Sequence, residues 1–278
     1  MKLLLHPLSQ KRYDSTVANP PQSILLVAPA GSGKETLLKS LTSDILGSHP
    51  AGRLFELLPM EDKSSIGIEA IRDLKMMLRL KSAENRVVLI TKGSSLTIEA
   101  QNSLLKILEE PPRHVHFLIG VNVLGEVLDT IQSRSTVWRL NLPSQKQLRK
   151  YFSSYPDKAL SKALVIGESR VGLISAMLQE EQNHPLLQAI ETAKEILGED
   201  HFNRLLRVDS LSKNVPQTKV LLEAMELVCK AAVENAAGKN SHTTPQWNKR
   251  LKFIVESQEN LSKNIQTKLI LSHLFLVL

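Results

Sequence analysis

A glycine-rich loop between an apolar run and a helical pattern constrains the fold of this chain more than any other feature. Residues 23–28 (SILLVA) are typical of a buried strand, residues 28–35 (APAGSGKE) form the loop, and a helical pattern continues to about Ile45. In a loop of the form G-x-x-x-x-G-K-[ST], backbone N–H groups and the helix N-terminus bind phosphate oxygens. The lysine of such a loop reaches the terminal phosphates, and its hydroxyl ligates Mg²⁺. The sequence therefore predicts a strand–loop–helix unit of the phosphate-binding kind.

Two of the signature residues of this loop are replaced. Gly31, Gly33 and Lys34 are in place, but Ala28 stands where the first glycine belongs and Glu35 stands at the hydroxyl position. A carboxylate there would repel a bound phosphate, because two like charges about 4 Å apart interact by about 4 kcal/mol at intermediate dielectric. We expect the loop to keep its shape and to bind magnesium nucleotide poorly, with a glycine-rich turn around an empty site as the alternative. The candidate nucleotide-binding residues are Pro29, Ala30, Gly31, Ser32, Gly33, Lys34, Glu35 and Thr36.

A second nucleotide motif should place acidic residues after a later strand, one to hold Mg²⁺ and one to polarise the attacking water. The best candidate strand, residues 86–90 (RVVLI), runs instead into Thr91 and Lys92, and neither side chain can do this work at neutral pH. Thr36 lies about a third of a turn round the helix from the hydroxyl position and is a poor substitute for it. The loop hydroxyl and both acidic positions are missing from one site, and together these losses argue against hydrolysis. Thr91 and Lys92 are interpreted as a degenerate form of the acidic motif.

The first half of the chain alternates apolar runs with helical patterns. Strands are expected at residues 23–28, 53–58, 86–91, 115–121 and 135–140, and helices at 67–80 and 97–112. Thr97 can cap the last of these helices, and Pro111 and Pro112 must stop it. Strand–helix alternation with continuous apolar strands predicts a parallel sheet covered by helices on both faces.

From Pro143 onward the pattern is helical, with no convincing strand. Helices are expected at residues 144–153, 157–166, 171–182, 184–198 and 215–237, and then in longer stretches to the end. This pattern predicts an α/β domain at residues 1–142, a small helical domain at 143–183 and an all-α C-terminal domain at 184–278.

The composition limits which partners and metal sites the chain can have. The net charge of +7 favours a polyanionic partner only mildly, because a solvated basic surface explains it equally well. Lys75, Arg79, Lys81 and Arg86 could contact a phosphate backbone or simply form such a surface. The single cysteine, Cys229, excludes an internal disulfide and a multi-cysteine zinc site, and it suits a reducing cytoplasm. The apolar C-terminal run is ten residues long, whereas a membrane helix needs about 20.

Residues 102–122 (NSLLKILEEPPRHVHFLIGVN), followed by 130–135 (TIQSRS), resemble sliding-clamp loader subunits of the AAA+ class. Those proteins carry an LLKxLEEPP helix, a strand and an SRC motif, whose cysteine is Ser135 here. The resemblance is strong over residues 20–140, and residues 259–278 are similar to the last collar helix of the family. It implies an AAA+ P-loop domain with a parallel sheet, a small helical lid and an all-α oligomerisation collar.

Within this family, the altered loop and the missing acids are most similar to the delta-prime subunits of bacterial DNA polymerase III. The resemblance implies a subunit without ATP hydrolysis of its own, which lends an arginine finger in trans to a neighbouring ATP site. Arg134 matches that finger, Asn122 matches a sensor residue after its strand, and Arg170 matches a second sensor in the lid. An ordinary surface arginine is the plainer interpretation of Arg134.

The resemblance also implies partners and cofactors. The partners would be gamma/tau-like and delta-like loader subunits, with the sliding clamp and primer–template DNA reached through the assembly, and no membrane. ATP or ADP could be held without efficient hydrolysis, and no other cofactor is expected. Many relatives carry a four-cysteine zinc module, which this composition excludes. The segment between Leu46 and Arg53, where that module would stand, is short.

Other interpretations stay open. A gamma/tau-type ATPase would bind ATP through Lys34 and use Glu35 or Thr36 for Mg²⁺, and a different interaction protein could use the same scaffold. A classification with DNA-directed DNA polymerases would reflect the assembly alone, because no paired metal-binding aspartates are visible. Glu109 and Glu110 are expected to be a solvated helix end, whose charge opposes the helix dipole and so favours a basic partner nearby.

Overall fold

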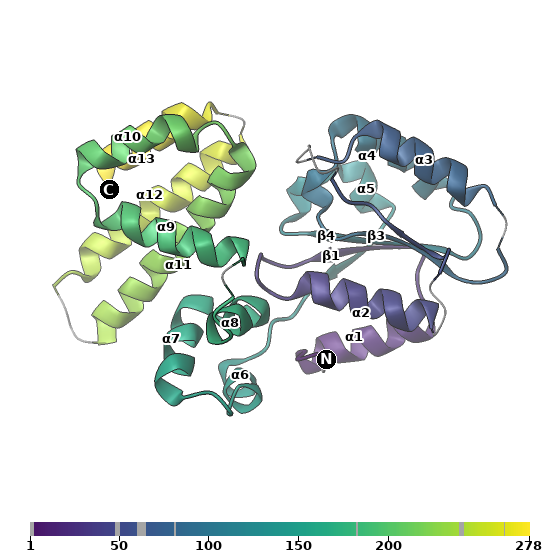
Figure 1. Cartoon of the computed structure of the whole chain (residues 1–278), viewed down its shortest axis with the longest axis horizontal. Helices are drawn as coiled ribbons and strands as arrows, with labels where there is room; N and C mark the ends of the chain where they lie inside the picture. Colours follow the sequence, from purple (N-terminus) through teal and green to yellow (C-terminus); the bar gives the residue numbers. More distant parts are fainter. Residues whose placement is uncertain are drawn as a thin grey trace. The chain divides into compact units, whose positions relative to one another are not determined.

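The computed structural model describes residues 3–47, 51–59, 65–80, 82–181, 183–238, 242–263 and 265–278. The chain divides into two compact units, Met1–Ser144 and Gln145–Leu278. Figure 1 shows the first unit as a sheet with helices and the second as helices alone. In the described part of the chain, no helix is both long and apolar enough to cross a membrane.

The N-terminal unit is built on a five-stranded sheet with the strand order β2-β3-β4-β1-β5. Every neighbouring pair of strands is parallel. The strands are β1 (Ser23–Val27), β2 (Leu54–Glu56), β3 (Arg86–Ile90), β4 (Val115–Val121) and β5 (Thr136–Arg139). The central strands are the continuous apolar runs of the sequence, because both faces of a parallel sheet are buried. The predicted fold class is confirmed.

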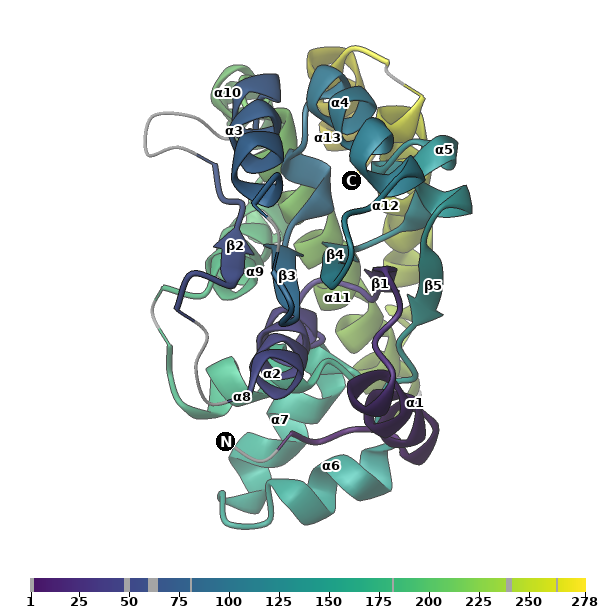
Figure 2. The ribbon, with the colours of Figure 1, turned by 90° about the vertical axis from the view of Figure 1, so that its right-hand side faces the viewer.

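Alternate residues along the strands lie on opposite faces of the sheet and belong to two separate hydrophobic cores. On one face, Leu25 and Val88 pack with α3 (Ile68–Leu78), α4 (Ile98–Glu109) and α5 (Asp129–Ser133). On the other face, residues such as Ile24 and Trp138 pack with α1 and α2. Helix α1 spans Pro7–Ala18 and α2 spans Lys34–Leu46. Figures 1 and 2 show this division, with α1 and α2 on the opposite side of the sheet from α3, α4 and α5.

Helix α1 also contacts the edge strand β5 and the segment that follows it, and this helix was not expected from the sequence. Ser9 Oγ donates to the carbonyl of Asn141 at 3.1 Å, and Arg12 Nη2 donates to the carbonyl of Val137 at 2.8 Å. The buried residues of α1 include Ser9 and Thr16, so its inner face is largely polar and lacks an apolar period. Covering an edge strand protects its unpaired backbone from pairing with another chain.

The observed start and end of α4 follow from the residues that cap and stop it. Thr97 Oγ1 accepts from the N–H of Ala100, as expected of an N-cap. The helix ends at Glu109, three residues before the predicted end at 112, because Glu110 precedes a proline and leaves the helical region. The end of α4 is thereby fixed in space, with the Glu109 side chain at its last position.

The second unit consists of helices in its described residues. They are α6 (Gln145–Tyr151), α7 (Asp157–Gly167), α8 (Val171–Leu178), α9 (Pro185–Gly198), α10 (His201–Leu211), α11 (Val215–Gly238), α12 (Thr244–Ser262) and α13 (Thr267–Val277). Helix α11 packs against α9 and α12, and also against α7. The division of this half into a lid and a collar at residue 183 stays a prediction.

One of the basic residues considered for nucleic-acid contact is not available for it. Arg86 is 5% exposed, and its guanidinium donates to the carbonyls of Leu78 and Leu80 at the end of α3. It therefore caps a helix, which corrects its interpretation as a surface contact. Lys81, the neighbouring candidate, lies outside the described residues.

Candidate functional site

The glycine-rich loop leaves the central strand β1 and enters α2 with the backbone shape that its glycines allow. Gly31 and Gly33 have φ of 74° and 87°, in the left-handed region that glycine adopts without strain. Gly33 is the N-cap of α2, and its carbonyl accepts from Leu37 N at 3.0 Å. Strand, loop and helix therefore lie where the sequence places them.

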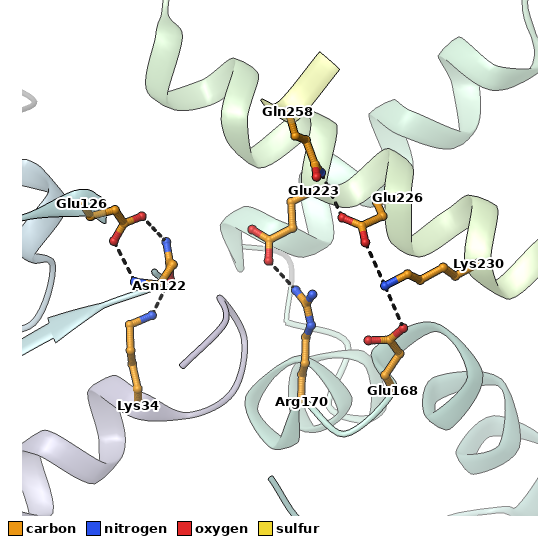
Figure 3. Close-up of polar contacts among 9 residues, drawn as sticks. All are labelled: Lys34, Asn122, Glu126, Glu168, Arg170, Glu223, Glu226, Lys230 and Gln258. Atoms are coloured by element: carbon orange, nitrogen blue, oxygen red, sulfur yellow. Dashed lines mark hydrogen bonds and ion pairs between the residues drawn. The ribbon is translucent and has the colours of Figure 1, made fainter. Parts of the chain in front are cut away.

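Lys34 and Asn122 lie together at the carboxyl end of the sheet, because β1 and β4 are parallel neighbours. Lys34 Nζ donates to Asn122 Oδ1 at 2.6 Å. Glu126 holds the asparagine from the other side: the backbone N–H of Asn122 donates to Glu126 Oε2 at 2.7 Å, and Asn122 Nδ2 donates to Oε1 at 3.1 Å. Figure 3 shows the three side chains joined in this row.

These bonds fix which way the Asn122 amide points. Its oxygen faces the lysine and its nitrogen faces the carboxylate of Glu126, so a rotated amide would lose both partners. A sensor asparagine that helps hydrolysis must offer a polar atom to the γ-phosphate or to the attacking water. Here both ends of the amide have partners within the chain, and the ammonium of Lys34 has an acceptor without any nucleotide.

Neither Glu35, at the hydroxyl position, nor Thr36 beside it bonds to this row in the described part of the chain. The carboxylate of Glu35 accepts from Lys39 Nζ at 2.8 Å on the exposed surface of α2. This hydrogen bond raises the pKa of Lys39 above its ordinary value. Thr36 is exposed. Ser32 Oγ, in contrast, is buried and has no hydrogen-bond partner in the described part of the chain.

The end of β3 carries no acid. Thr91 is 4% exposed, and Lys92 is exposed on the strand's exit. The chain is tightly packed here, since a Cβ at Gly120 would lie 2.6 Å from the carbonyl oxygen of Thr91. The positions that would hold a cation and a base are therefore occupied by a threonine and a lysine.

Arg134 lies at the opposite end of the strands from the glycine-rich loop. It ends α5 and comes just before β5, whereas the loop follows the carboxyl end of β1, and β1 and β5 are parallel. The hydroxyls of Ser23, at the start of β1, and of Ser135 are 2.8 Å apart. Five residues of strand at about 3.3 Å each separate Ser23 from the loop. The Ser135 that replaces cysteine thus joins the start of β1 to the Arg134 turn.

The guanidinium of Arg134 has acceptors on two elements. Its Nη1 donates to the carbonyl of Thr130 at 3.1 Å and to Ser133 Oγ at 3.3 Å. Its Nη2 lies 2.9 Å from Glu109 Oε1 at the end of α4. The basic partner expected for this helix end is therefore Arg134 of the same chain.

Arg170 belongs to the C-terminal unit, where it is 8% exposed at the start of α8. Its Nη1 lies 2.5 Å from Glu223 Oε1 on α11. On the same helix, Lys230 contacts Glu168 at 3.5 Å and Glu226 at 2.8 Å. Figure 3 shows these pairs between the α7–α8 connection and α11. Arg170 therefore has a structural role inside its own unit, and its role as a sensor stays a prediction.

Comparison with known proteins places these features in a family context. A family model described as DNA polymerase III, delta subunit, matches residues 47–144. The DNA polymerase III subunit delta' of Haemophilus influenzae is 30% identical over 57% of this chain and 55% of its own length. The subunit of the same name from Yersinia pestis is 32% identical over 51% of this chain and 42% of its own length. The replication factor C small subunit of Haloarcula marismortui is 28% identical over 42% of this chain.

A solved structure covers more of the chain. A DNA polymerase III gamma subunit-related protein of Thermotoga maritima has a TM-score of 0.55 at 17% identity, over 96% of this chain and 97% of its own. This likeness shows the fold.

The chain is thus similar to AAA+ clamp-loader subunits, and the resemblance inferred from the sequence is confirmed. Among the named relatives, the chain is similar to delta-prime subunits of DNA polymerase III. It spans about half the length of the curated relatives it matches.

Glu126 was missed in the sequence, and the partner of Glu109 was not identified there. Glu126 orients Asn122, and Glu109 contacts Arg134. The position of Glu126 four residues after Asn122 is a weak signal, because this spacing has a fixed geometry only in a helix. The contact of Glu109 with Arg134 joins two elements and has no signal in the local sequence.

Proposed function

We propose that the chain is a clamp-loader subunit of the delta-prime kind, which does not hydrolyse ATP and supplies Arg134 to an ATP site of a neighbouring subunit. It would act in the DNA polymerase III assembly that places the sliding clamp on primer–template DNA. The family-model match over residues 47–144 and the similarity to a delta-prime subunit over 57% of the chain support the class of protein.

One observation carries the proposed role of Arg134. The arginine and the glycine-rich loop lie at opposite ends of two parallel strands, β1 and β5. Arg134 therefore cannot reach a phosphate in the loop of its own chain, and any phosphate it binds must come from another molecule. A guanidinium is suited to that work, because it is permanently charged and can bind phosphate oxygens through two N–H groups.

The state of the chain's own loop supports the absence of hydrolysis. Lys34 is bonded to Asn122, and Asn122 is fixed by Glu126. The carboxylate of Glu35 is bonded to Lys39 on the outside of α2, and the end of β3 offers Thr91 in place of an acid. The carboxylate that lies beside Lys34, that of Glu126, accepts from the backbone N–H and the amide nitrogen of Asn122 through its two oxygens, so it is engaged within the chain. ADP or ATP could still bind weakly through the loop N–H groups.

Assembly through residues 184–278 is part of the same proposal. Phe202 and Leu206 on α10 are 71% and 64% exposed, and Leu269 and Leu276 on α13 are 62% and 57% exposed. Helices α10 and α13 pack against each other, so these apolar side chains belong to neighbouring elements. Exposed apolar groups gathered on adjoining helices are typical of subunit contacts. We place the assembled protein in the cytoplasm.

Arg134→Ala in the assembled loader tests the proposal. The tagged chain, purified from its own cell, is expected to bring gamma/tau-like and delta-like subunits with it. Without the arginine, hydrolysis at the ATP site that Arg134 faces should fall by on the order of 10³-fold, because the guanidinium stabilises charge in the transition state. The ATP hydrolysis of the whole assembly should fall by the share that this site contributes. Arg113→Ala, an exposed arginine beyond the end of α4, is the matched control. An unchanged rate in the intact assembly would remove the proposed role.

The gamma/tau-type ATPase is the second candidate, favoured by Gly31, Gly33 and Lys34 at their motif positions. It predicts that the purified chain releases phosphate from ATP and loses this activity on Lys34→Ala. The delta-prime-like function predicts that the two proteins release phosphate at the same background rate. A different interaction protein on this scaffold would co-purify with partners other than loader subunits.

A further inference from the structure

We propose that Glu109 is a positioning residue for Arg134: its carboxylate holds the guanidinium in the orientation in which it meets the neighbour's phosphate. This inference rests on the proposed function and adds a second residue to it. The ion pair of Glu109 with Arg134 joins two exposed groups, so its contribution to the stability of the fold is small. What the ion pair does is orient the guanidinium of Arg134.

The guanidinium is held from two elements at once. Thr130 and Ser133 on α5 accept from Nη1 at 3.1 and 3.3 Å, and Glu109 on α4 lies 2.9 Å from Nη2. Because the group is planar, acceptors on both terminal nitrogens fix its plane as well as its position. The side chain is 36% exposed, and no acceptor contacts Nε in the part of the chain that the structure describes. A face of the cation is therefore left for an incoming anion.

The position of Glu109 is set by the backbone and not by the ion pair. It is the last residue of α4, which stops because Glu110 precedes Pro111. A carboxylate at a helix C-terminus is unfavourable to the helix dipole, so stability of α4 does not account for this residue. Glu110, next in the chain, has the same charge and makes no ion pair or hydrogen bond among the described residues. Glu110 is therefore a suitable control for Glu109, because the two residues carry the same charge and only Glu109 contacts Arg134.

The consequence for binding is pre-organisation. A free arginine side chain must lose rotamer freedom when it engages a phosphate, whereas one already held in place loses less. The negative charge of Glu109 partly cancels that of Arg134, so it weakens the long-range attraction of the arginine to a phosphate. The same contact helps an interaction that depends on the orientation of the guanidinium. Orientation matters most in the transition state, where small displacements lower the rate steeply. We therefore expect Glu109 to affect kcat more than KM.

Glu109→Gln in the assembled loader is the test, with Glu110→Gln as its control. The substitution keeps the size of the side chain and removes its charge. Glu109→Gln should lower kcat for ATP by about 10-fold with little change in KM, and Glu110→Gln should leave both at the wild-type values. In an Arg134→Ala background, Glu109→Gln should have no further effect, because the residue acts through the arginine. Unchanged assembly and thermal melting of each variant exclude a folding defect.

The results for Arg134→Ala and Glu109→Gln distinguish a failure of the proposed function from a failure of the role given to Glu109. If Arg134→Ala leaves hydrolysis unchanged, the arginine has no role in trans and both ideas fail. If Arg134→Ala lowers the rate while Glu109→Gln leaves it unchanged or raises it, the proposed function stands and Glu109 is not a positioning residue. An effect of Glu109→Gln that adds to that of Arg134→Ala would overturn the inference as well.

Discussion

At the scale of single residues, the loop site is a set of polar groups that satisfy one another. Lys34, Asn122 and Glu126 form a row in which each donor has an acceptor, with distances of 2.6 to 3.1 Å. A pocket that relies on its ligand to complete these bonds would have unpaired groups when empty. In this row the side chains supply these partners to one another. Ser32, whose buried Oγ has no partner among the described residues, is the exception.

Glu126→Ala tests this row directly. The change leaves the backbone N–H and the amide nitrogen of Asn122 without their acceptor, which should lower the free energy of unfolding of the N-terminal unit by about 1–3 kcal/mol. Urea unfolding followed by the fluorescence of Trp138, in a Trp247→Phe background, would measure it. Glu126→Gln keeps one acceptor oxygen and should lose less than Glu126→Ala. Equal stability of Glu126→Ala and wild type would contradict the assigned hydrogen bonds.

At the scale of elements, the sequence predicted what depends on local pattern and missed what depends on tertiary contact. The strands β1, β3 and β4 were predicted within one residue, because continuous apolar runs fit only a sheet buried on both faces. The cap of α4 by Thr97 was predicted for the same local reason. Helix α1 was missed, since its buried face is largely polar and becomes a core face only against β5.

The site divides in the same way. The strand–loop–helix unit was predicted because it is encoded in a short stretch of chain, and the assignment of Arg134 as an arginine finger stays a prediction. The partners of these residues, Glu126 and Glu109, depend on how separate elements meet, and local sequence does not encode that. The same limit applies to Arg86, whose burial under the end of α3 is invisible in a run of basic residues.

Helix α11 offers a chemical test of the second unit. Cys229 is 0% exposed on this helix, and burial raises the pKa of its thiol to about 12. At pH 8 only about one thiol in ten thousand would be thiolate, so a thiol reagent should label the native chain at least about 100-fold more slowly than the urea-unfolded chain. The chain has no other cysteine, so all labelling reports on this position. Fast labelling of the native protein would contradict the packing of α11.

At the scale of the whole molecule, the proposed function is a division of labour. The N-terminal unit carries a phosphate-binding loop at one end of its sheet and an arginine at the other. At the loop, the carboxylate of Glu126 is bonded to Asn122 and the carboxylate of Glu35 to Lys39, whereas Arg134 is held by acceptors on two elements and is partly exposed. The C-terminal unit adds exposed apolar groups on α10 and α13. Under the proposed function, such a chain would contribute to catalysis only inside an assembly, where its arginine would meet a nucleotide held by another subunit.

The central claim is that the chain acts on a neighbour's nucleotide and not on its own. The most direct measurement is ATP hydrolysis by one reconstituted loader carrying this chain as wild type, as Lys34→Ala or as Arg134→Ala. We predict a wild-type rate for Lys34→Ala and, for Arg134→Ala, a clear fall in the rate of the assembly, because hydrolysis at the site that Arg134 faces is lower by on the order of 10³-fold. The reverse pattern, a large loss with Lys34→Ala and none with Arg134→Ala, would contradict the account.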